Sequence, residues 1–311
     1  MRAHRIGIVG YGKIAQDQHV PVIKGGDAFV LVAVSSTRGA GPPGLDRIFR
    51  DYRDMLAMGD LDAVAICTPP NVRHAIARDA LAAGKHVMLE KPPAATLSEL
   101  EDLARRASAA NLTLFTTWHS QANAGVDEAR RRLQGQRVRR LAITWREDVR
   151  RWHPGQTWIW EAGGFGVFDP GINGLSILTK IFPDPIFVQA ATLSFPANAD
   201  APIAADLVFS TGRGEEDLRA NFDWREDGPQ IWDIVVETEA GQTLHLAEGG
   251  SRLSVDGREV VAQPPAEYEG LYARFGELIN AGTSEVDAAP FRLVADAFMI
   301  GRRVQVEPFT E

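Results

Sequence analysis

HRIGIVGYGKIA, residues 4–15, joins a short β-branched run to a glycine-rich turn and then to the start of a helical pattern. Gly10, Gly12 and Ala15 stand at the spacing G-x-G-x-x-A. In this pattern the first glycine makes a tight turn, the second lets the backbone approach a pyrophosphate, and the third small residue lets helix and strand pack closely. Because a strand precedes the turn and a helix follows it, the stretch predicts a dinucleotide site at a helix N-terminus.

The residues around this turn alternate short apolar runs with helical spacing as far as about residue 120. The expected buried strands are HRIGIV, FVLVAVS, DAVAIC, KHVMLE and LTLFTT, and the expected helices cover residues 12–24, 71–83 and 96–110. This strand–helix rhythm implies a parallel sheet with crossover helices. We therefore predict a doubly wound Rossmann α/β domain over residues 1–120, with a flexible surface loop at residues 38–44.

Residues 121–311 have a different texture, because strands of alternating pattern replace the strand–helix rhythm and all seven tryptophans lie at or beyond Trp118. The expected strands are RRLAITWRE, IFVQAATLSF, AADLVFS, LRANFDW, IWDIVVETEAG and QTLHLAEGG, with a helix at FDPGINGLSILTKIF and a helical ending from about Tyr268. The pattern predicts an α+β domain with a predominantly antiparallel open sheet and flanking helices.

Composition narrows the classes of function. At 311 residues we expect two domains, or one domain with a large appendage, rather than one compact core. The net charge of −8 offers no basic face for nucleic acid or an anionic membrane. Cys67, the only cysteine, lies in the apolar run AVAIC, which excludes an internal disulfide and indicates a buried strand residue in a reducing compartment. RIGIVG is too short for the core of a signal peptide, and no later run could span a bilayer. We expect a cytoplasmic protein with a small-molecule ligand.

The end of the second expected strand bears on the choice of dinucleotide. It reads Ser35-Ser36-Thr37-Arg38, where an acidic side chain would hold the ribose hydroxyl of NAD. Hydroxyls and a guanidinium suit a 2′-phosphate, which a carboxylate would repel. The sequence therefore favours NADP over NAD. The alternative is that Arg38 is a solvated loop residue and NAD also binds.

With the glycine pattern, the run LDAVAICTPPNVRHAIARDALAAGKHVMLEKP at residues 61–92 resembles the glucose-fructose oxidoreductase and inositol dehydrogenase family, often called Gfo/Idh/MocA. The resemblance continues through GGFGVFDPGIN and so covers nearly the whole chain. Within the family, WREDVRRWHPGQTWIWEAGGFGVFDPGIN looks like the bacterial aldose 1-dehydrogenases, which oxidise L-arabinose or D-galactose at the anomeric carbon.

The resemblance implies a two-domain oxidoreductase in which nicotinamide and sugar meet between the dinucleotide domain and the open sheet. It also implies a homo-oligomer, a dimer through the sheet, since the exposed sheet face would otherwise be a large apolar patch. The cofactor contacts that we expect are Gly10, Gly12, Lys13, Ile14, Ser36, Thr37, Arg38, Thr68, Asn71, Glu90 and Lys91.

Oxidation of a sugar at C1 to a lactone requires hydride transfer and loss of the hydroxyl proton, without a metal. In the family the lysine of EKP, here Lys91, lies beside the nicotinamide and the reacting hydroxyl. Most members carry a D-x-x-x-H pair whose histidine is the acid/base, but this chain has Asp169 and Asn173. Because an amide cannot exchange a proton at neutral pH, Asn173 can only hold a hydroxyl. We expect Asp169 to be the base and Lys91 to position the anomeric oxygen, although the opposite assignment stays open.

Asp169 has a second interpretation from local chemistry alone. Asp-Pro is typical of a helix start, with the aspartate accepting from first-turn amides and Pro170 at the first helical position. Capping alone would make Asp169 a structural residue. The motif and its partners favour the catalytic interpretation.

Sugar recognition needs polar groups for hydroxyls and flat aromatic faces for C–H surfaces. Four tryptophans crowd into residues 145–160 with Glu147, Asp148 and His153 among them. By resemblance, the expected substrate contacts are His119, Glu147, Trp152, His153, Asn173 and Trp232. Each has the alternative of a core or structural role. The seven histidines form no ligand spacing, and we predict no metal.

Two rivals to the aldose 1-dehydrogenase remain. One is a family oxidoreductase that acts at another sugar carbon or carbonyl, because this fold supports many substrates. The other is a non-catalytic NADP-binding sensor, which has no reason to retain Lys91, Asp169 and a polar, tryptophan-rich site together.

Overall fold

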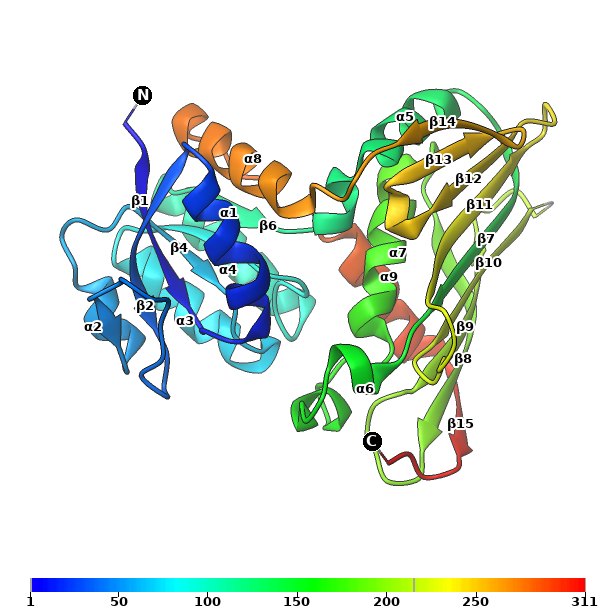
Figure 1. The fold of residues 1–311 in the computed structure, drawn as a ribbon. Coiled ribbons are helices and arrows are strands. Elements are labelled where there is room, and N and C mark those ends of the chain that lie inside the picture. Colours follow the sequence, from blue (N-terminus) through cyan, green and yellow to red (C-terminus); the bar gives the residue numbers. More distant parts are fainter. Residues whose placement is uncertain (1, 215, 311) are drawn as a thin grey trace. The chain divides into compact units, whose positions relative to one another are not determined.

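A computed structural model describes residues 2–214 and 216–310 (Figure 1). Its contacts divide the chain into two compact units. Unit 1 comprises residues 1–119 and 267–288, and unit 2 comprises residues 120–266 and 289–311. No helix among the described residues is long and apolar enough to cross a membrane.

Unit 1 is built on a six-stranded sheet in which every pair of neighbouring strands is parallel. Its strands are β1 (His4–Val9), β2 (Phe29–Ser35), β3 (Ile48–Phe49), β4 (Ala63–Ile66), β5 (His86–Leu89) and β6 (Leu114–Thr116), in the order β3-β2-β1-β4-β5-β6. This is the strand order of a dinucleotide-binding doubly wound fold, whose order reverses between β1 and β4. The Rossmann prediction is confirmed; the short β3 was not expected.

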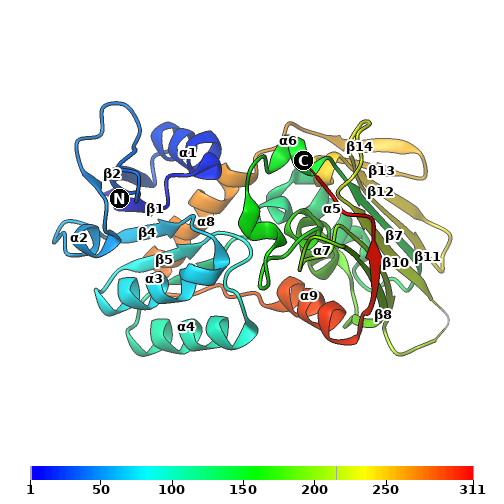
Figure 2. The ribbon, with the colours of Figure 1, turned by 90° about the horizontal axis from the view of Figure 1, so that it is seen from below.

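Helices cover both faces of this sheet. They are η1 (Ala15–His19), α1 (Val20–Gly25), α2 (Tyr52–Leu56), α3 (Pro70–Ala82), α4 (Leu97–Ala109) and α8 (Glu267–Ala281). In Figure 2, α1 lies on one side of the sheet and α3 and α4 lie on the other. The start of α4 follows from its sequence, because Thr96 accepts from the Glu99 amide while the Glu99 side chain accepts from the Thr96 amide, a capping box.

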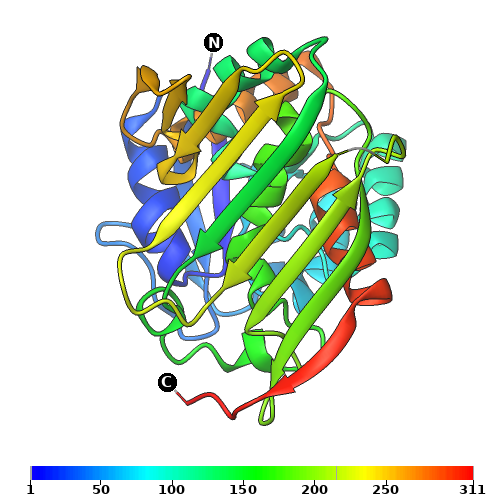
Figure 3. The same cartoon turned by 90° about the vertical axis from the view of Figure 1, so that its right-hand side faces the viewer.

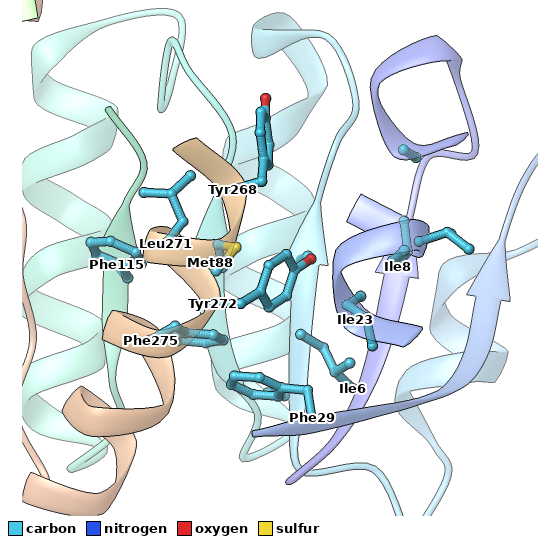
Figure 4. Close-up of a cluster of buried hydrophobic side chains, with 14 of the residues drawn as sticks. Ile6, Ile8, Ile23, Phe29, Met88, Phe115, Tyr268, Leu271, Tyr272 and Phe275 are labelled. Carbon is cyan, nitrogen blue, oxygen red and sulfur yellow. The ribbon is translucent and has the colours of Figure 1, made fainter. Parts of the chain in front are cut away.

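Helix α8 completes the core of unit 1 although it comes late in the chain. Tyr268, Tyr272 and Phe275 of α8 pack among Phe29 and Phe115 of the sheet (Figure 4). The rings of Phe29 and Phe275 are stacked with centroids 5.3 Å apart. The sequence assigned this helix to the second domain, and the contacts instead assign residues 267–288 to unit 1. The apolar face of α8 explains the difference, because it fills the face of the sheet beside α1.

Unit 2 is built on a nine-stranded, mostly antiparallel sheet (Figure 3). Its strands are β7 (Val138–Arg146), β8 (Phe187–Pro196), β9 (Ala204–Ser210), β10 (Asp217–Asp223), β11 (Ile231–Thr238), β12 (Thr243–Ala247), β13 (Arg252–Val255), β14 (Arg258–Ala262) and β15 (Arg302–Val306). Two pairs, β7 with β10 and β8 with β15, are parallel. The predicted open sheet is confirmed, and the sequence patterns missed β13, β14 and β15.

One face of this sheet carries the helices of unit 2. They are α5 (Ala124–Leu133), α6 (Val149–Trp152), α7 (Phe168–Ile181) and α9 (Ala289–Ile300), with short 3-10 helices η3 (Thr157–Trp160) and η4 (Glu248–Gly250). A further 3-10 helix, η2 (His119–Ala122), spans the boundary between the units, because His119 belongs to unit 1. Alternate strand residues such as Leu141, Ile143 and Trp145 of β7 are buried on the helix side. Helix α7 is apolar on most of its surface and is therefore largely buried.

The opposite face, which Figure 3 shows free of helices, carries polar side chains on β7, β9 and β10, where an apolar patch was expected. Asn221 accepts a hydrogen bond from Arg146 Nε at 2.7 Å and donates one to Asp206 at 2.7 Å. These side chains form a ladder across neighbouring strands. An argument for association that rests on exposed apolar area therefore does not hold for this part of the sheet.

Candidate functional site

The glycine-rich turn lies where the carboxyl ends of β1, β2 and β4 meet. The Gly10 amide donates to Ser35 O at 2.9 Å, and the Cys67 amide donates to Val9 O at 2.8 Å. Gly10 has φ +94°, and a Cβ there would stand 2.9 Å from Thr68 Cγ2. Gly12 differs, since a Cβ there would meet no atom within 4 Å, so the backbone faces open space. Cys67 is half-buried just after β4 rather than fully buried within it.

This turn fits the dinucleotide that the glycine pattern implies. The hydroxyl Oγ1 of Thr68 is buried beside Gly10 and has no hydrogen-bond partner among the described residues. A ligand oxygen or a water at the turn would satisfy it. Helical conformation begins at Lys13, directly after the turn, so the first amides of this helix are available to an anion.

The other expected cofactor residues gather around the same turn. Ser36 is buried, whereas Arg38 is exposed and its Nη2 lies 3.5 Å from the carbonyl oxygen of Tyr11. Lys13 and Ile14 are exposed, and the Lys13 ammonium pairs with Asp17. Asn71 is exposed in the first turn of α3.

Arg50 is a residue that the sequence analysis missed. Its Nη1 donates to Thr37 O at 3.2 Å, and its guanidinium lies 3.3 Å from the place of a Cβ on Gly39. A second guanidinium therefore lies beside the Ser36–Arg38 segment. No local pattern marks Arg50, because it reaches the loop from β3 only after the chain has folded.

Glu90 anchors the segment that carries Lys91. Its carboxylate is buried and accepts from the Lys91 amide at 2.8 Å, from Tyr268 at 2.8 Å and from His19 at 3.0 Å. Burial opposes ionisation, but the hydrogen bond and charge of His19 hold the pKa of Glu90 at about 2. Burial likewise opposes charge on His19, and contacts with Cys67, Tyr272 and Glu90 raise its pKa well above 6.5. Glu90 thus has an interior role, and a direct cofactor contact remains a prediction.

Arg73 of α3 holds the backbone on both sides of Lys91. Its guanidinium is buried and donates to the carbonyl oxygens of Glu90, Pro92 and Thr68. One side chain therefore connects the ends of β4 and β5 at the segment from which the Lys91 side chain projects. Lys91 itself follows β5 at its carboxyl end, as expected.

His119 also belongs to unit 1. Its Nδ1 lies 2.7 Å from Glu267 Oε2, and its ring stacks on Tyr268 with centroids 5.4 Å apart. Burial opposes its charge, but Glu267 raises its pKa above 6.5. His119 therefore forms a structural ion pair with Glu267, and its substrate contact remains a prediction.

In unit 2, Asp169 is the second residue of α7, which begins at Phe168 after Val167 as N-cap. The capping interpretation is therefore wrong, since the N-cap residue is Val167 and makes no side-chain cap bond. Pro170 stands third, where its missing N–H costs nothing because first-turn amides have no partner in the helix. The Asp169 carboxylate is buried, and its Oδ2 lies 3.4 Å from His153 Nε2.

Asn173 lies one turn further along α7, on the same side as Asp169. Its backbone carbonyl accepts from Ser176 Oγ at 2.7 Å. Within residues 2–214 and 216–310, its side-chain amide makes no hydrogen bond. That amide is therefore available to a ligand hydroxyl, as its predicted role requires.

Glu147 joins two indoles of the aromatic cluster. Its buried carboxylate accepts from Trp224 Nε1 at 3.2 Å and from Trp232 Nε1 at 2.9 Å. The Trp232 ring lies between Trp145 and Trp152, with centroids 5.8 Å from each. The Trp152 N–H is buried with no partner among the described residues. The structure thus brings Glu147, Trp152 and Trp232 together, with Glu147 in a mainly structural position.

The predicted site residues are shared between the units. Lys91 and His119 belong to unit 1, whereas Glu147, Trp152, His153, Asp169, Asn173 and Trp232 belong to unit 2. Across the part of the chain that the structure describes, no three His, Cys, Asp or Glu side chains are grouped to hold a metal ion.

Comparison with known proteins agrees with the Rossmann fold of unit 1. Residues 4–117 match the Gfo/Idh/MocA family, described as an oxidoreductase family with an NAD-binding Rossmann fold. The chain belongs to this family of oxidoreductases.

Particular relatives match the chain from end to end. Galactose 1-dehydrogenase of Pseudomonas fluorescens is 46% identical over 311 residues, which cover 99% of each chain. The crystal structure of D-galactose-1-dehydrogenase from Rhizobium etli is 50% identical, with a TM-score of 0.93 and coverage of 100% of this chain and 99% of that one. A point mutant of the 3-ketoreductase KijD10 of Actinomadura kijaniata, solved with TDP-benzene and NADP, is 17% identical with a TM-score of 0.85 over 98% of this chain and 99% of its own, and shares the fold.

Proposed function

We propose that this protein is an NAD(P)-dependent aldose 1-dehydrogenase, which oxidises an aldopyranose such as D-galactose or L-arabinose at C1 to the aldonolactone. The observation that carries the proposal is the end-to-end similarity to two galactose 1-dehydrogenases. The polar and aromatic cluster of unit 2 supports it, since a buried carboxylate, an unpartnered amide and indole rings suit a sugar.

In the proposed reaction the nicotinamide, when bound, accepts the hydride from C1. Gly10, Gly12 and Thr68 would hold the pyrophosphate, and Ser36, Thr37 and Arg38 the adenosine ribose, with NADP preferred. Asp169 takes the hydroxyl proton while Lys91 holds the anomeric oxygen and Asn173 a neighbouring hydroxyl. Trp152 and Trp232 contact the sugar through their indole groups.

A panel of aldoses assayed with both cofactors tests the proposal. Reduction of NADP with D-galactose or L-arabinose, and formation of the lactone, are the expected results. Turnover only with a substrate oxidised at another carbon would favour the first rival. Tight NADP binding without turnover on any sugar would favour the sensor.

Replacing Asp169 by Asn separates chemistry from structure. The amide keeps the size of the side chain but cannot accept a proton, so we expect kcat to fall by about 10²–10⁴-fold. The thermal midpoint should change little. Measured kcat within a few-fold of the parent would reject Asp169 as the base.

We also infer a cytoplasmic location and a homodimer through the open sheet face of unit 2. The first inference rests on a single free cysteine, Cys67, which suits a reducing compartment. The second rests on a nine-stranded sheet with one face that unit 2 leaves uncovered. Light scattering after gel filtration would show a 34.0 kDa monomer if the dimer is wrong.

A further inference from the structure

Unit 2 lacks, at position 173, the histidine that acts as acid/base in most members of the family. The family's acid/base histidine would stand four residues after Asp169, and asparagine occupies that place. Asp169 is 4% exposed, so a proton that it takes has no direct way to bulk water through its own surface. A titrating group next to this carboxylate would therefore complete the chemistry.

His153 is such a group. It follows α6 as its C-cap residue and reaches α7, where its Nε2 lies 3.4 Å from Asp169 Oδ2. Its other ring nitrogen, Nδ1, lies 3.4 Å from Gln156 Oε1. The side chain of His153 is 18% exposed, against 5% for that of Asp169, so the imidazole has more access to solvent than the carboxylate it contacts.

The surroundings hold this ring in place. The His153 imidazole packs on the Trp224 indole with centroids 5.1 Å apart. Trp224 is fully buried, and its N–H is held by Glu147 at 3.2 Å. A ring packed against a fixed partner can keep one nitrogen directed at Asp169.

We propose that His153 replaces the missing histidine of the D-x-x-x-H pair and carries the proton that Asp169 removes, an inference that rests on the proposed function. The C1 hydrogen leaves as hydride to the nicotinamide, the C1–O bond becomes a carbonyl, and the hydroxyl proton goes to the Asp169 carboxylate. That proton passes to His153 Nε2, and the imidazolium releases a proton to water from its exposed side. The same pair functions whether the sugar is D-galactose or L-arabinose.

Two substitutions at this position separate proton transfer from positioning. His153→Gln can still hydrogen-bond Asp169 but cannot titrate, and His153→Ala leaves space for added imidazole. We expect both to lower kcat by at least about 100-fold, within the usual range for an acid/base group, and imidazole to restore part of the activity of the alanine variant alone. His74→Ala is the matched control, because His74 of α3 pairs with Asp102 of α4 at 3.0 Å and its loss should leave kcat unchanged.

Full activity of His153→Gln would overturn the proposal, since His153 would then only hold Asp169 in place. If the wild-type protein oxidises the sugar and both His153 variants are equally active, the proton-transfer role of His153 is wrong, while the proposed function still stands.

A spectroscopic measurement tests the contact between His153 and Asp169 even if no sugar is oxidised. Nitrogen-15 spectra of the histidine rings should show the His153 Nε2 signal moving in Asp169→Asn, with the His74 signals unchanged. An unmoved His153 signal would overturn the pair, whatever the assays of activity give.

Discussion

Arg38 and Arg50 place two guanidinium groups at the carboxyl end of β2. Arg38 lies 3.5 Å from the Tyr11 carbonyl oxygen of the glycine turn and Arg50 donates to the neighbouring loop, so we propose that both contact an added phosphate on the ribose. The segment Ser35–Arg38 has no carboxylate, which would repel the 2′-phosphate of NADP and so favour NAD.

Replacing either arginine by alanine should therefore weaken NADP much more than NAD. Each charge-assisted contact to a phosphate contributes roughly 1.5–3 kcal/mol, so we expect Kd for NADP to rise by about tenfold or more and Kd for NAD to stay within about twofold. Titration of each cofactor by fluorescence measures both constants. Arg53→Ala, an exposed arginine on α2, is the control. Equal losses for the two cofactors would contradict the assignment.

Residue types alone explain only part of unit 2. That Asn173 cannot exchange a proton follows from the sequence, as does the need for another group. The identity of that group does not, because His153 is sixteen positions before Asp169 on another element and no periodic pattern connects them.

At the scale of elements, α3 positions the segment after β5 through Arg73. Its guanidinium supplies donors to three backbone carbonyls on the two strand ends. A methionine in this place keeps the aliphatic stem but leaves those buried oxygens without a donor.

Arg73→Met should therefore lower both stability and turnover. Each orphaned buried carbonyl costs roughly 1–3 kcal/mol, so we expect a loss of several kcal/mol in urea unfolding and a fall in kcat as Lys91 loses its fixed place. Arg78→Met on the exposed side of the same helix is the control and should stay within about 0.5 kcal/mol. A stable, fully active Arg73→Met would show that the strand ends hold Lys91 without it.

The buried pair His19–Glu90 gives unit 1 a pH-dependent stability. Glu90, held at a pKa of about 2 against an ordinary 4.5, stabilises the fold above pH 4.5 and loses this as pH falls toward 2. His19, whose pKa is raised above 6.5, stabilises the fold below pH 6.5 and loses this as pH rises through its folded value. The contribution of the pair is therefore greatest between pH 4.5 and 6.5.

His19→Gln should flatten the alkaline side of this dependence. Urea midpoints followed by circular dichroism from about pH 4 to pH 9 would show the parent weakening above pH 6.5 and the variant changing less. His74→Gln is the control, since its partner Asp102 lies outside the buried network. Parallel curves for the parent and His19→Gln would contradict the charged pair.

For the molecule as a whole, the sequence by itself determined the parallel Rossmann sheet, the glycine-rich turn at Gly10 and Gly12, the open sheet and the family. These features follow from local patterns, since strand and helix periods and turn glycines act over neighbouring residues. The tertiary structure alone decided four features. They are the packing of α8 in unit 1, the hydrogen bonds of Arg73 to backbone carbonyls beside Lys91, the hydrogen bonds of Glu147 to two indoles, and the pairing of His153 with Asp169. Each joins residues that no helix or strand period relates, and only packing of the completed cores selects such contacts.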